Sequence, residues 1–599
     1  MSRSGFLSRV LMGVTWLVLL SAPLQAAPNV ALNVASADED LTRDLRAASL
    51  TLVAIEQEQT GSADLVSAAL ADYKRFIETL YAYGYYSGVV RIRVDGREVA
   101  SLSLVSLPGE IRSIEMSVDP GPQFRFGQTS VAPLASGDAP PEGFAPGEPA
   151  FATVIRVTSQ AAVVGWREAG YAKAQQGDQR IVADHAANTL SADLRIIPGP
   201  KVRFGDLIIK GDSAVRREAM ARIAGFPGGR EFSPDRMSAV ATRLRRTGAF
   251  ASVSLREGEV EPDGSMDVEL TVVDRKPRRF GVGAELTSFE GLDLTGFWMH
   301  RNIFGGAENL RVEAEINQIG AQTSGIDYLL STRLTFPALL RADVDVFAQA
   351  ELESVDDPLY ALDRLELTGG IVWYARAGIS AELAASLLRS RTVTALGERY
   401  FSMLSFPAVV SWDRRDDPLD ATTGTFLRVE VTPYVGFSGT ASGARFYADA
   451  RGYRSIAGGR AVIAGRVQWG SILGSSLTET YPDFLFYSGG GGTVRGQPYQ
   501  SLGVGLPGIN GQVGGRSFLG TMLELRTSVT ESIGAVVFAD TGFIGSDSFV
   551  NGSGDWHAGA GVGLRYNTGI GPLRVDVAAP VQGTTGDGVQ IYIGIGQAF

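Results

Sequence analysis

The 599-residue sequence contains no cysteine and only three histidines, His185, His300 and His557. Without thiols the protein can form no disulfide, no thiolate metal site and no cysteine nucleophile. The histidines are widely separated, and no nucleophile with an orienting acid accompanies any of them in the sequence. The sequence therefore predicts no metal site, no cofactor and no enzymatic activity.

Positive charge and long apolar segments are also scarce. The 54 Lys and Arg residues are outnumbered by 65 Asp and Glu residues, which argues against nucleic-acid binding. Arg3 and Arg9 begin a basic N-terminus that is followed by the apolar run Val10–Leu20 and by small residues. That run is shorter than a membrane-spanning helix, and no later stretch approaches the roughly 18 apolar residues required. We interpret residues 1–27 as an export signal peptide.

Two sequence markers recur in the N-terminal half of the chain. Asp119-Pro-Gly-Pro-Gln-Phe-Arg-Phe-Gly127 returns as Ile197-Pro-Gly-Pro-Lys-Val-Arg-Phe-Gly205. A second marker recurs three times, as Gly84-Tyr85-Tyr86, Gly170-Tyr171-Ala172 and Gly248-Ala249-Phe250. Because both markers repeat at nearly the same interval, we predict three copies of one module, in residues 28–119, 120–199 and 200–276.

Each module is predicted to have the order βααββ, with two helices packed on a three-stranded sheet. In the third copy Val202–Lys210 alternates like a strand, and Ser233-Pro234 is typical of a helix start. The first copy has longer predicted helices, Asp38–Gln57 and Ala63–Tyr83. The second copy contains a segment rich in proline and glycine, Gly137–Pro149, which we interpret as a loop.

Helical periodicity disappears in residues 277–599, which consist of alternating segments separated by Gly, Asp, Asn and Ser. In Arg341–Leu352, for example, alanine, valine and leucine take one face, whereas Asp343, Asp345 and Glu351 take the other. A soluble sandwich also alternates, but long apolar faces opposite charged ones favour a lipid-facing exterior around a wet lumen. At about 20 residues per strand and turn, the segment accommodates about 16 antiparallel strands of an all-β transmembrane barrel. Closure leaves no unpaired edge in the bilayer.

Several local motifs match one known pattern. Val494-Arg495-Gly496 resembles the VRG[FY] loop signature, and Phe538-Ala-Asp540-Thr-Gly542 resembles the F-x-D-x-G strand signature. Trp412–Leu419 resembles a hairpin that is common in one superfamily of outer-membrane barrels, and the segment from Gly571 to Phe599 resembles the hairpin that closes those barrels. With its tandem modules, the chain resembles the BamA/TamA superfamily, whose modules are called POTRA domains. It departs from the pattern at Gln497, where the family usually has an aromatic residue.

The resemblance implies a bacterial outer-membrane barrel with its modules in the periplasm. It implies a function in assembling unfolded outer-membrane proteins, such as autotransporters, by module docking and barrel-assisted insertion. Three modules favour the TamA-like members, whose implied partner is a TamB-like protein anchored in the inner membrane. The other expected contact is outer-membrane lipid, around a monomeric barrel. The alternatives are a two-partner secretion pore, which usually has two modules, and a passive diffusion porin, which needs neither modules nor a fixed loop.

The loop Gly489–Gly503 contains one charged residue, Arg495. The resemblance implies that this loop folds into the barrel, where the arginine meets acidic residues of the wall. Strand alternation places Glu524 and Asp540 on lumenal faces, and Phe538 shares the face of Asp540. We therefore predict a lumenal loop lock that comprises Val494, Arg495, Gly496, Glu524, Phe538, Asp540 and Gly542. The alternative is an arginine on a surface loop, without a fixed partner.

The C-terminal segment is predicted to close the barrel by pairing Gln590–Gly596 with the first strand, Phe280–Leu286. Glycines at 594 and 596 weaken a strand, because they add backbone freedom and pack no side chain. We therefore hypothesise that the barrel opens laterally between its first and last strands. Alternation places Phe599 on the lipid face, where the resemblance places an assembly signal. The predicted residues of the closing strand and signal are Gln590, Tyr592, Gly594, Gly596 and Phe599.

Overall fold

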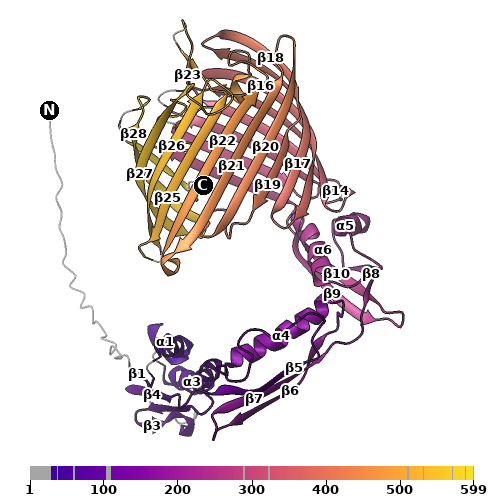
Figure 1. The fold of residues 1–599 in the computed structure, drawn as a ribbon, viewed down its shortest axis with the longest axis vertical. Coiled ribbons are helices and arrows are strands. Elements are labelled where there is room, and N and C mark those ends of the chain that lie inside the picture. Colours follow the sequence, from indigo (N-terminus) through magenta and orange to yellow (C-terminus); the bar gives the residue numbers. More distant parts are fainter. Residues whose placement is uncertain are drawn as a thin grey trace, which may run out of the picture. The chain divides into compact units, whose positions relative to one another are not determined.

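The computed structural model describes residues 28–599, except for residues 37, 58–60, 103–109, 288–290, 322–323, 509–510, 531, 570, 587 and 598. Three small sheets with helices precede a closed antiparallel barrel, which confirms the predicted fold class (Figure 1). The chain divides into two compact units, Met1–Arg203 with Glu231–Pro234, and Phe204–Arg230 with Asp235–Phe599. The predicted signal peptide lies outside the described residues. None of the helices that the structure describes is both long and apolar enough to cross a membrane.

Among its described residues the first module contains three α-helices rather than the two predicted. Its elements are β1 (Asn29–Val34), α1 (Glu39–Ala48), α2 (Leu50–Glu56), α3 (Ser62–Ala82), β2 (Val89–Val94), β3 (Arg97–Glu98) and β4 (Ser113–Asp119). The predicted first helix is broken at Ser49. The buried carboxylate of Asp72 accepts hydrogen bonds from Ser49 Oγ (2.7 Å) and from the backbone nitrogens of Leu50 (2.7 Å) and Thr51 (3.1 Å). These bonds hold the start of α2 and compensate the buried charge.

The second module has one helix among its described residues, so the predicted βααββ order is wrong for this copy. Its elements are β5 (Arg125–Ala132), α4 (Ala152–Glu168), β6 (Gln175–Asp184) and β7 (Thr189–Ile197). The segment between β5 and α4 includes the predicted loop Gly137–Pro149, which the structure confirms as a loop. It holds five prolines between residues 133 and 149, and proline inside a helix removes a hydrogen bond and clashes with the preceding turn. Phe144 of this loop instead packs its ring against Phe126 of β5, with ring centroids 5.4 Å apart.

The third module has the predicted βααββ order. Its elements are β8 (Arg203–Lys210), α5 (Arg217–Ala224), α6 (Pro234–Arg246), β9 (Phe250–Val260) and β10 (Ser265–Asp274). Arg243 of α6 donates two hydrogen bonds to Asp343, at 2.6 and 3.0 Å. Arg246 donates to the carbonyl oxygen of Ala342 (3.1 Å). These contacts fix the helices of this module against a turn of the barrel.

The barrel contains 16 strand positions among its described residues. Its strands are β11 (Arg278–Thr287), β12 (Gly291–His300), β13 (Asn309–Ile319), β14 (Asp327–Arg341), β15 (Val344–Asp356), β16 (Tyr360–Arg376), β17 (Ile379–Thr394), β18 (Gly397–Ser405), β19 (Ala408–Asp413), β20 (Gly424–Phe437), β21 (Gly443–Ile456), β22 (Ala461–Leu473), β25 (Ser517–Ser528), β26 (Ile533–Gly545), β27 (Gly554–Thr568), β28 (Gly571–Gln582) and β29 (Gln590–Ile595). Both β18 and β19 pair with β17 and β20, so they share one position. Pro407, which lacks a backbone donor, lies between them.

The seam between β11 and β29 is short. Among the residues that the structure describes, two pairs are in register across it, Leu286 with Ile593 and Thr287 with Tyr592. By contrast, ten pairs join β11 to β12 and six join β28 to β29. The last strand ends at Ile595, and Gly596 follows with a φ of 92°. Backbone pairing therefore closes the described barrel more weakly at this seam than between the neighbouring strands.

Candidate functional site

The described part of the long connection between β22 and β25, residues 474–516, packs in large part against the inner wall. Tyr481 belongs to an apolar cluster with wall residues of β16, β17, β18 and β20. Phe486 and Leu502 belong to a second cluster that includes Phe518 of β25 and Ile544 of β26. The loop also carries the short strands β23 (Val504–Gly505) and β24 (Gln512–Val513). Its apolar side chains thus anchor it inside the barrel.

Arg495 lies at the centre of this buried loop, and 1% of its surface is exposed. Its Nε and Nη2 donate to the two carboxylate oxygens of Asp540, at 2.7 and 2.9 Å. Its Nη1 donates to Glu524 Oε1 at 2.6 Å. The guanidinium carbon stands 3.6 Å from the ring centre of Phe538. The structure thus brings the arginine together with both predicted carboxylates and with the predicted aromatic ring, in the fork geometry that lysine cannot reproduce.

A third carboxylate, Asp576 of β28, also lies against the arginine, 3.3 Å from Nη1. It was not predicted, although alternation along the segment 573–577 would have placed Asp576 opposite Leu573, Val575 and Val577. Two further arginines complete the cluster: Arg526 donates to Glu524 (2.8 Å), and Arg565 pairs with Asp576. Three carboxylates therefore meet three guanidinium groups. Such pairing offsets the large desolvation cost of burying each charge.

Two glycines allow the loop to approach the wall this closely. Gly496 has a φ of 90°, and a Cβ there would lie 2.6 Å from the carbonyl oxygen of Ala579. A Cβ at Gly542 would lie 2.9 Å from the side chain of Val494, which is fully buried. Any larger residue at either position would force the loop away from the strands. The predicted positions Val494, Gly496 and Gly542 thus form the tight part of the contact.

The loop also binds the closing strand. Tyr592 donates through its hydroxyl to Gln590 Oε1 (2.7 Å), and the same hydroxyl accepts from the backbone nitrogen of Gly496 (3.1 Å). Gln590 Nε2 donates to the carbonyl oxygen of Gly496 at 3.3 Å. Both side chains are buried in the lumen. The buried loop is consequently hydrogen-bonded to the strand that forms one side of the short seam.

Gln497 takes part in a second set of polar contacts. Its Nε2 donates to the carbonyl oxygens of Ala558 (2.8 Å) and Gln582 (3.1 Å), and its Oε1 accepts from Thr585 Oγ1 (2.8 Å). His557 links the hydroxyls of Thr585 (3.0 Å) and Ser488 (2.7 Å) through its two ring nitrogens. Where the family pattern has an aromatic ring, this chain therefore anchors the loop with an amide.

The structure corrects the expectation for Phe599, which faces the lumen and not the lipid. Its ring packs beside Tyr453, with centroids 6.3 Å apart, and Arg526 Nη2 donates to its backbone oxygen (3.2 Å). The alternation of faces stops because Gly596, which has a positive φ, turns the chain after β29. The backbone nitrogen of Gly596 donates to the carbonyl oxygen of Pro572 (2.7 Å). Gly596 and Phe599 consequently lie beyond the closing strand, whereas Gln590, Tyr592 and Gly594 lie within it.

Replacing Phe599 with serine is expected to loosen the C-terminus, because emptying a buried aromatic site costs about 3–5 kcal/mol. The variant barrel should unfold in SDS at a lower temperature than the parent, as measured by heat-modifiable gel migration. Phe549, which is exposed in the loop between β26 and β27, is the matched control, and Phe549→Ser should leave that temperature unchanged. If the two changes lower the unfolding temperature in SDS equally, the lumenal contacts of Phe599 do not stabilise the barrel.

Gly594 makes room for an ion pair across the seam. Arg574 of β28 reaches over β29 to Glu285 of β11, with Nη2 and Oε1 2.5 Å apart. A Cβ at Gly594 would lie 3.2 Å from Glu285 Oε1 and 3.3 Å from Arg574 Nη2. This glycine therefore does more than weaken the strand, because a larger residue would crowd the two charged groups that join the barrel ends.

These features define a class: a β-barrel protein of the bacterial outer membrane, with periplasmic POTRA modules and a loop fixed inside the barrel. Residues 302–599 match the Omp85 superfamily domain. This part of the chain is thus similar to the domain that defines the Omp85 superfamily.

Known relatives are similar across the modules and the barrel. The "Outer membrane protein assembly factor BamA" of Neorickettsia risticii is 22% identical over 426 residues, which cover 67% of this chain and 56% of that protein. The chain thus spans little more than half the length of this curated relative. The structure of BamA from Haemophilus ducreyi lacking POTRA domains 1–3 is 16% identical, with a TM-score of 0.60, and covers 79% of this chain and 99% of its own. CdiB from Acinetobacter baumannii is 12% identical, with a TM-score of 0.51, over 79% of this chain and 90% of its own. These structural likenesses establish a shared fold.

Proposed function

We propose that this protein assembles other β-barrel proteins into the outer membrane, and that its β11–β29 seam is where client strands enter the bilayer. The observation that carries the proposal is the seam itself, which is held by two residue pairs in register among the residues that the structure describes. An opened seam would present strand edges whose backbone donors and acceptors can pair with an incoming strand. Such pairing matters within lipid, where each unsatisfied backbone group costs several kcal/mol.

The outer face beside the seam is also suited to receive apolar client side chains. Phe280 and Val282 of β11 are 72% and 94% exposed, and both precede Leu286 and Thr287, the described residues of β11 that pair with β29. The ion pair between Arg574 and Glu285 is a side-chain contact that opening must break, in addition to the backbone pairing. The Arg495 cluster holds β25, β26 and β28 to the loop, and the loop holds β29. The lock therefore positions one side of the seam.

Within the superfamily we propose a TamA-like protein that works with a TamB-like partner and assembles autotransporters among its clients. The three modules support this choice. A two-partner secretion pore is disfavoured because the buried residues of the connection between β22 and β25, among them Tyr481, Arg495 and Leu502, lie inside the barrel, where a translocated client would have to pass. A passive porin is disfavoured for the same reason, and it would not need the modules.

Reconstitution into liposomes tests the proposal. Liposomes that contain the protein should accelerate the folding of an added, urea-unfolded outer-membrane barrel, relative to liposomes without protein. Folding is measured as heat-modifiable gel migration of the client. Client accumulation inside the vesicles would favour the secretion pore, whereas solute leakage without client folding would favour the porin. Crosslinking of the full-length protein to an inner-membrane protein in cells tests the proposed partner separately.

A further inference from the structure

The outer wall of the barrel carries two arginines on β17, near the end farther from the third module. Leu388, Ser390 and Thr392 are buried on the lumenal face of this strand. Arg389 and Arg391 alternate with them and are exposed on the opposite face, which lies toward lipid. Arginine on a lipid face is strongly unfavourable at the middle of the bilayer and nearly neutral close to its surface. The presence of two such residues therefore requires an explanation.

The two arginines have different surroundings. Arg391 is neutralised by Glu398, to which its Nε and Nη2 donate at 3.1 and 2.9 Å, and Asp363 lies 3.6 Å away. Arg389 forms no ion pair or hydrogen bond with the residues that the structure describes around it. Of these two arginines, Arg389 is therefore the one whose five donors are available for an anion among the described residues.

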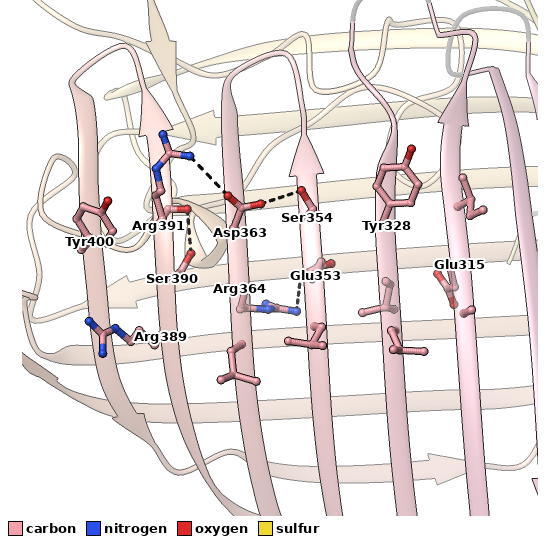
Figure 2. Close-up of a pocket in the computed structure, with 16 residues that line it drawn as sticks. Glu315, Tyr328, Glu353, Ser354, Asp363, Arg364, Arg389, Ser390, Arg391 and Tyr400 are labelled. Atoms are coloured by element: carbon pink, nitrogen blue, oxygen red, sulfur yellow. Dashed lines mark hydrogen bonds and ion pairs between the residues drawn. The ribbon is translucent and has the colours of Figure 1, made fainter.

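Arg389 borders an open groove of about 720 Å³ on this wall. Leu330, Leu352 and Leu365, which are exposed, give the groove an apolar lining. Tyr400 on β18 and Tyr328 on β14 lie toward its two sides (Figure 2). The groove therefore combines an apolar surface with a single unneutralised cation.

The depth of Arg389 matches the level of lipid headgroups. Strand β17 has 16 residues, and five of them, 390–394, separate Arg389 from the loop. Because a transmembrane strand needs about 9–11 residues to cross the hydrocarbon core, the end of β17 extends beyond it. Tyr328 and Tyr400 are 51% and 64% exposed, as in the aromatic girdle that marks the membrane interface. Phosphate is the anion that lipids supply at this level.

We propose that this groove binds one phosphate-bearing, multiply acylated lipid of the outer leaflet. Arg389 would hold the phosphate through its planar fork, and the acyl chains would lie along Leu330, Leu352 and Leu365. The apolar lining is the reason to favour a lipid over free phosphate. This site lies on the wall formed by β14–β18, and it is separate from the proposed function of the seam.

Native mass spectrometry of the full-length protein in detergent, with bis-phosphorylated lipid A as the probe, tests the site. The wild type should retain one lipid. Arg389→Gln should weaken binding about 10–100-fold, the equivalent of losing hydrogen bonds to a charged group, and Arg389→Lys should restore part of it. Arg454 of β21 also faces outward, near the opposite end of the barrel, so Arg454→Gln is the matched control and should bind like wild type.

Each of the following outcomes would contradict the proposed lipid site around Arg389. Equal binding by Arg389→Gln and wild type would remove the arginine from recognition, and equal weakening by Arg454→Gln would show nonspecific attraction to charge. Undiminished binding of dephosphorylated lipid A would reduce the groove to an apolar surface. Displacement of the lipid by millimolar inorganic phosphate would assign a free-anion site instead. Heat-modifiable migration confirms that each variant is folded.

Discussion

Arg495→Ala is expected to abolish most of the assembly activity while the barrel itself still forms. Removing the guanidinium leaves Glu524, Asp540 and Asp576 buried near one another, and breaking one side of a buried ion pair costs about 3–5 kcal/mol. That energy exceeds what holds a typical loop in place, so the segment 474–516 should leave the wall. Limited proteolysis of this loop, together with the rate of client folding in liposomes, measures the two effects.

Arg495→Lys should be milder than alanine but still defective, because an ammonium restores the charge without the two-pronged contact to Asp540. The matched control is Arg428→Ala, because Arg428 is 42% exposed in its side chain and contacts Glu430 at 3.1 Å. A pair so exposed contributes about 0–1 kcal/mol, so this variant should behave like wild type.

A double-mutant cycle separates the lock from unrelated damage. Glu524→Gln should weaken the same link, and combining it with Arg495→Ala should add little, because both changes remove one interaction. Glu524 also accepts a hydrogen bond from Arg526, so the double variant should be slightly more defective than Arg495→Ala alone. Fully additive defects, together with unchanged protease resistance of the loop, would contradict a functional lock around Arg495.

Strand alternation explains why much of the barrel could be predicted from the sequence. A period of two assigns each residue to one face, so Glu524, Phe538 and Asp540 could be placed in the lumen before their partners were known. The same rule failed at Phe599, because one glycine with a positive φ ended the strand three residues earlier. Alternation also contained the signal for Asp576, but it gives no information about which residue of a distant loop approaches a given wall position.

The modules show a different limit of sequence reasoning. Repeated markers predicted three copies, but the repeat does not fix the number of helices in each one. In the second copy a proline-rich loop with Phe144 takes the place of the first helix. In the first copy the buried Asp72 divides one predicted helix into α1 and α2. Both differences depend on tertiary contacts, namely the Phe144–Phe126 packing and the hydrogen bonds to Asp72, which local periodicity does not report.

The variant Leu286→Cys/Ile593→Cys, which can form a disulfide across the seam, is expected to lose all assembly activity under oxidising conditions. Adding a reductant should restore that activity. The two residues face each other in register across the seam, and the natural chain has no cysteine that would compete. Paired Cα atoms on neighbouring antiparallel strands are about 4.5–5.5 Å apart, which falls within the range of about 4.4–6.8 Å that a disulfide spans. The crosslink would therefore fit the closed seam and prevent it from opening.

A second crosslink provides the control. Val562 of β27 and Val577 of β28 also face each other on the outer wall, but eleven residue pairs already join these strands. Because these strands have no reason to separate, the Val562→Cys/Val577→Cys protein should assemble clients equally well when oxidised or reduced. Full activity of the oxidised seam variant would show that clients enter without opening the seam, whereas inactivity of both variants would assign the loss to rigidity of the whole barrel. Loss confined to the seam crosslink is the result that the short contact between the described residues of β11 and β29 predicts.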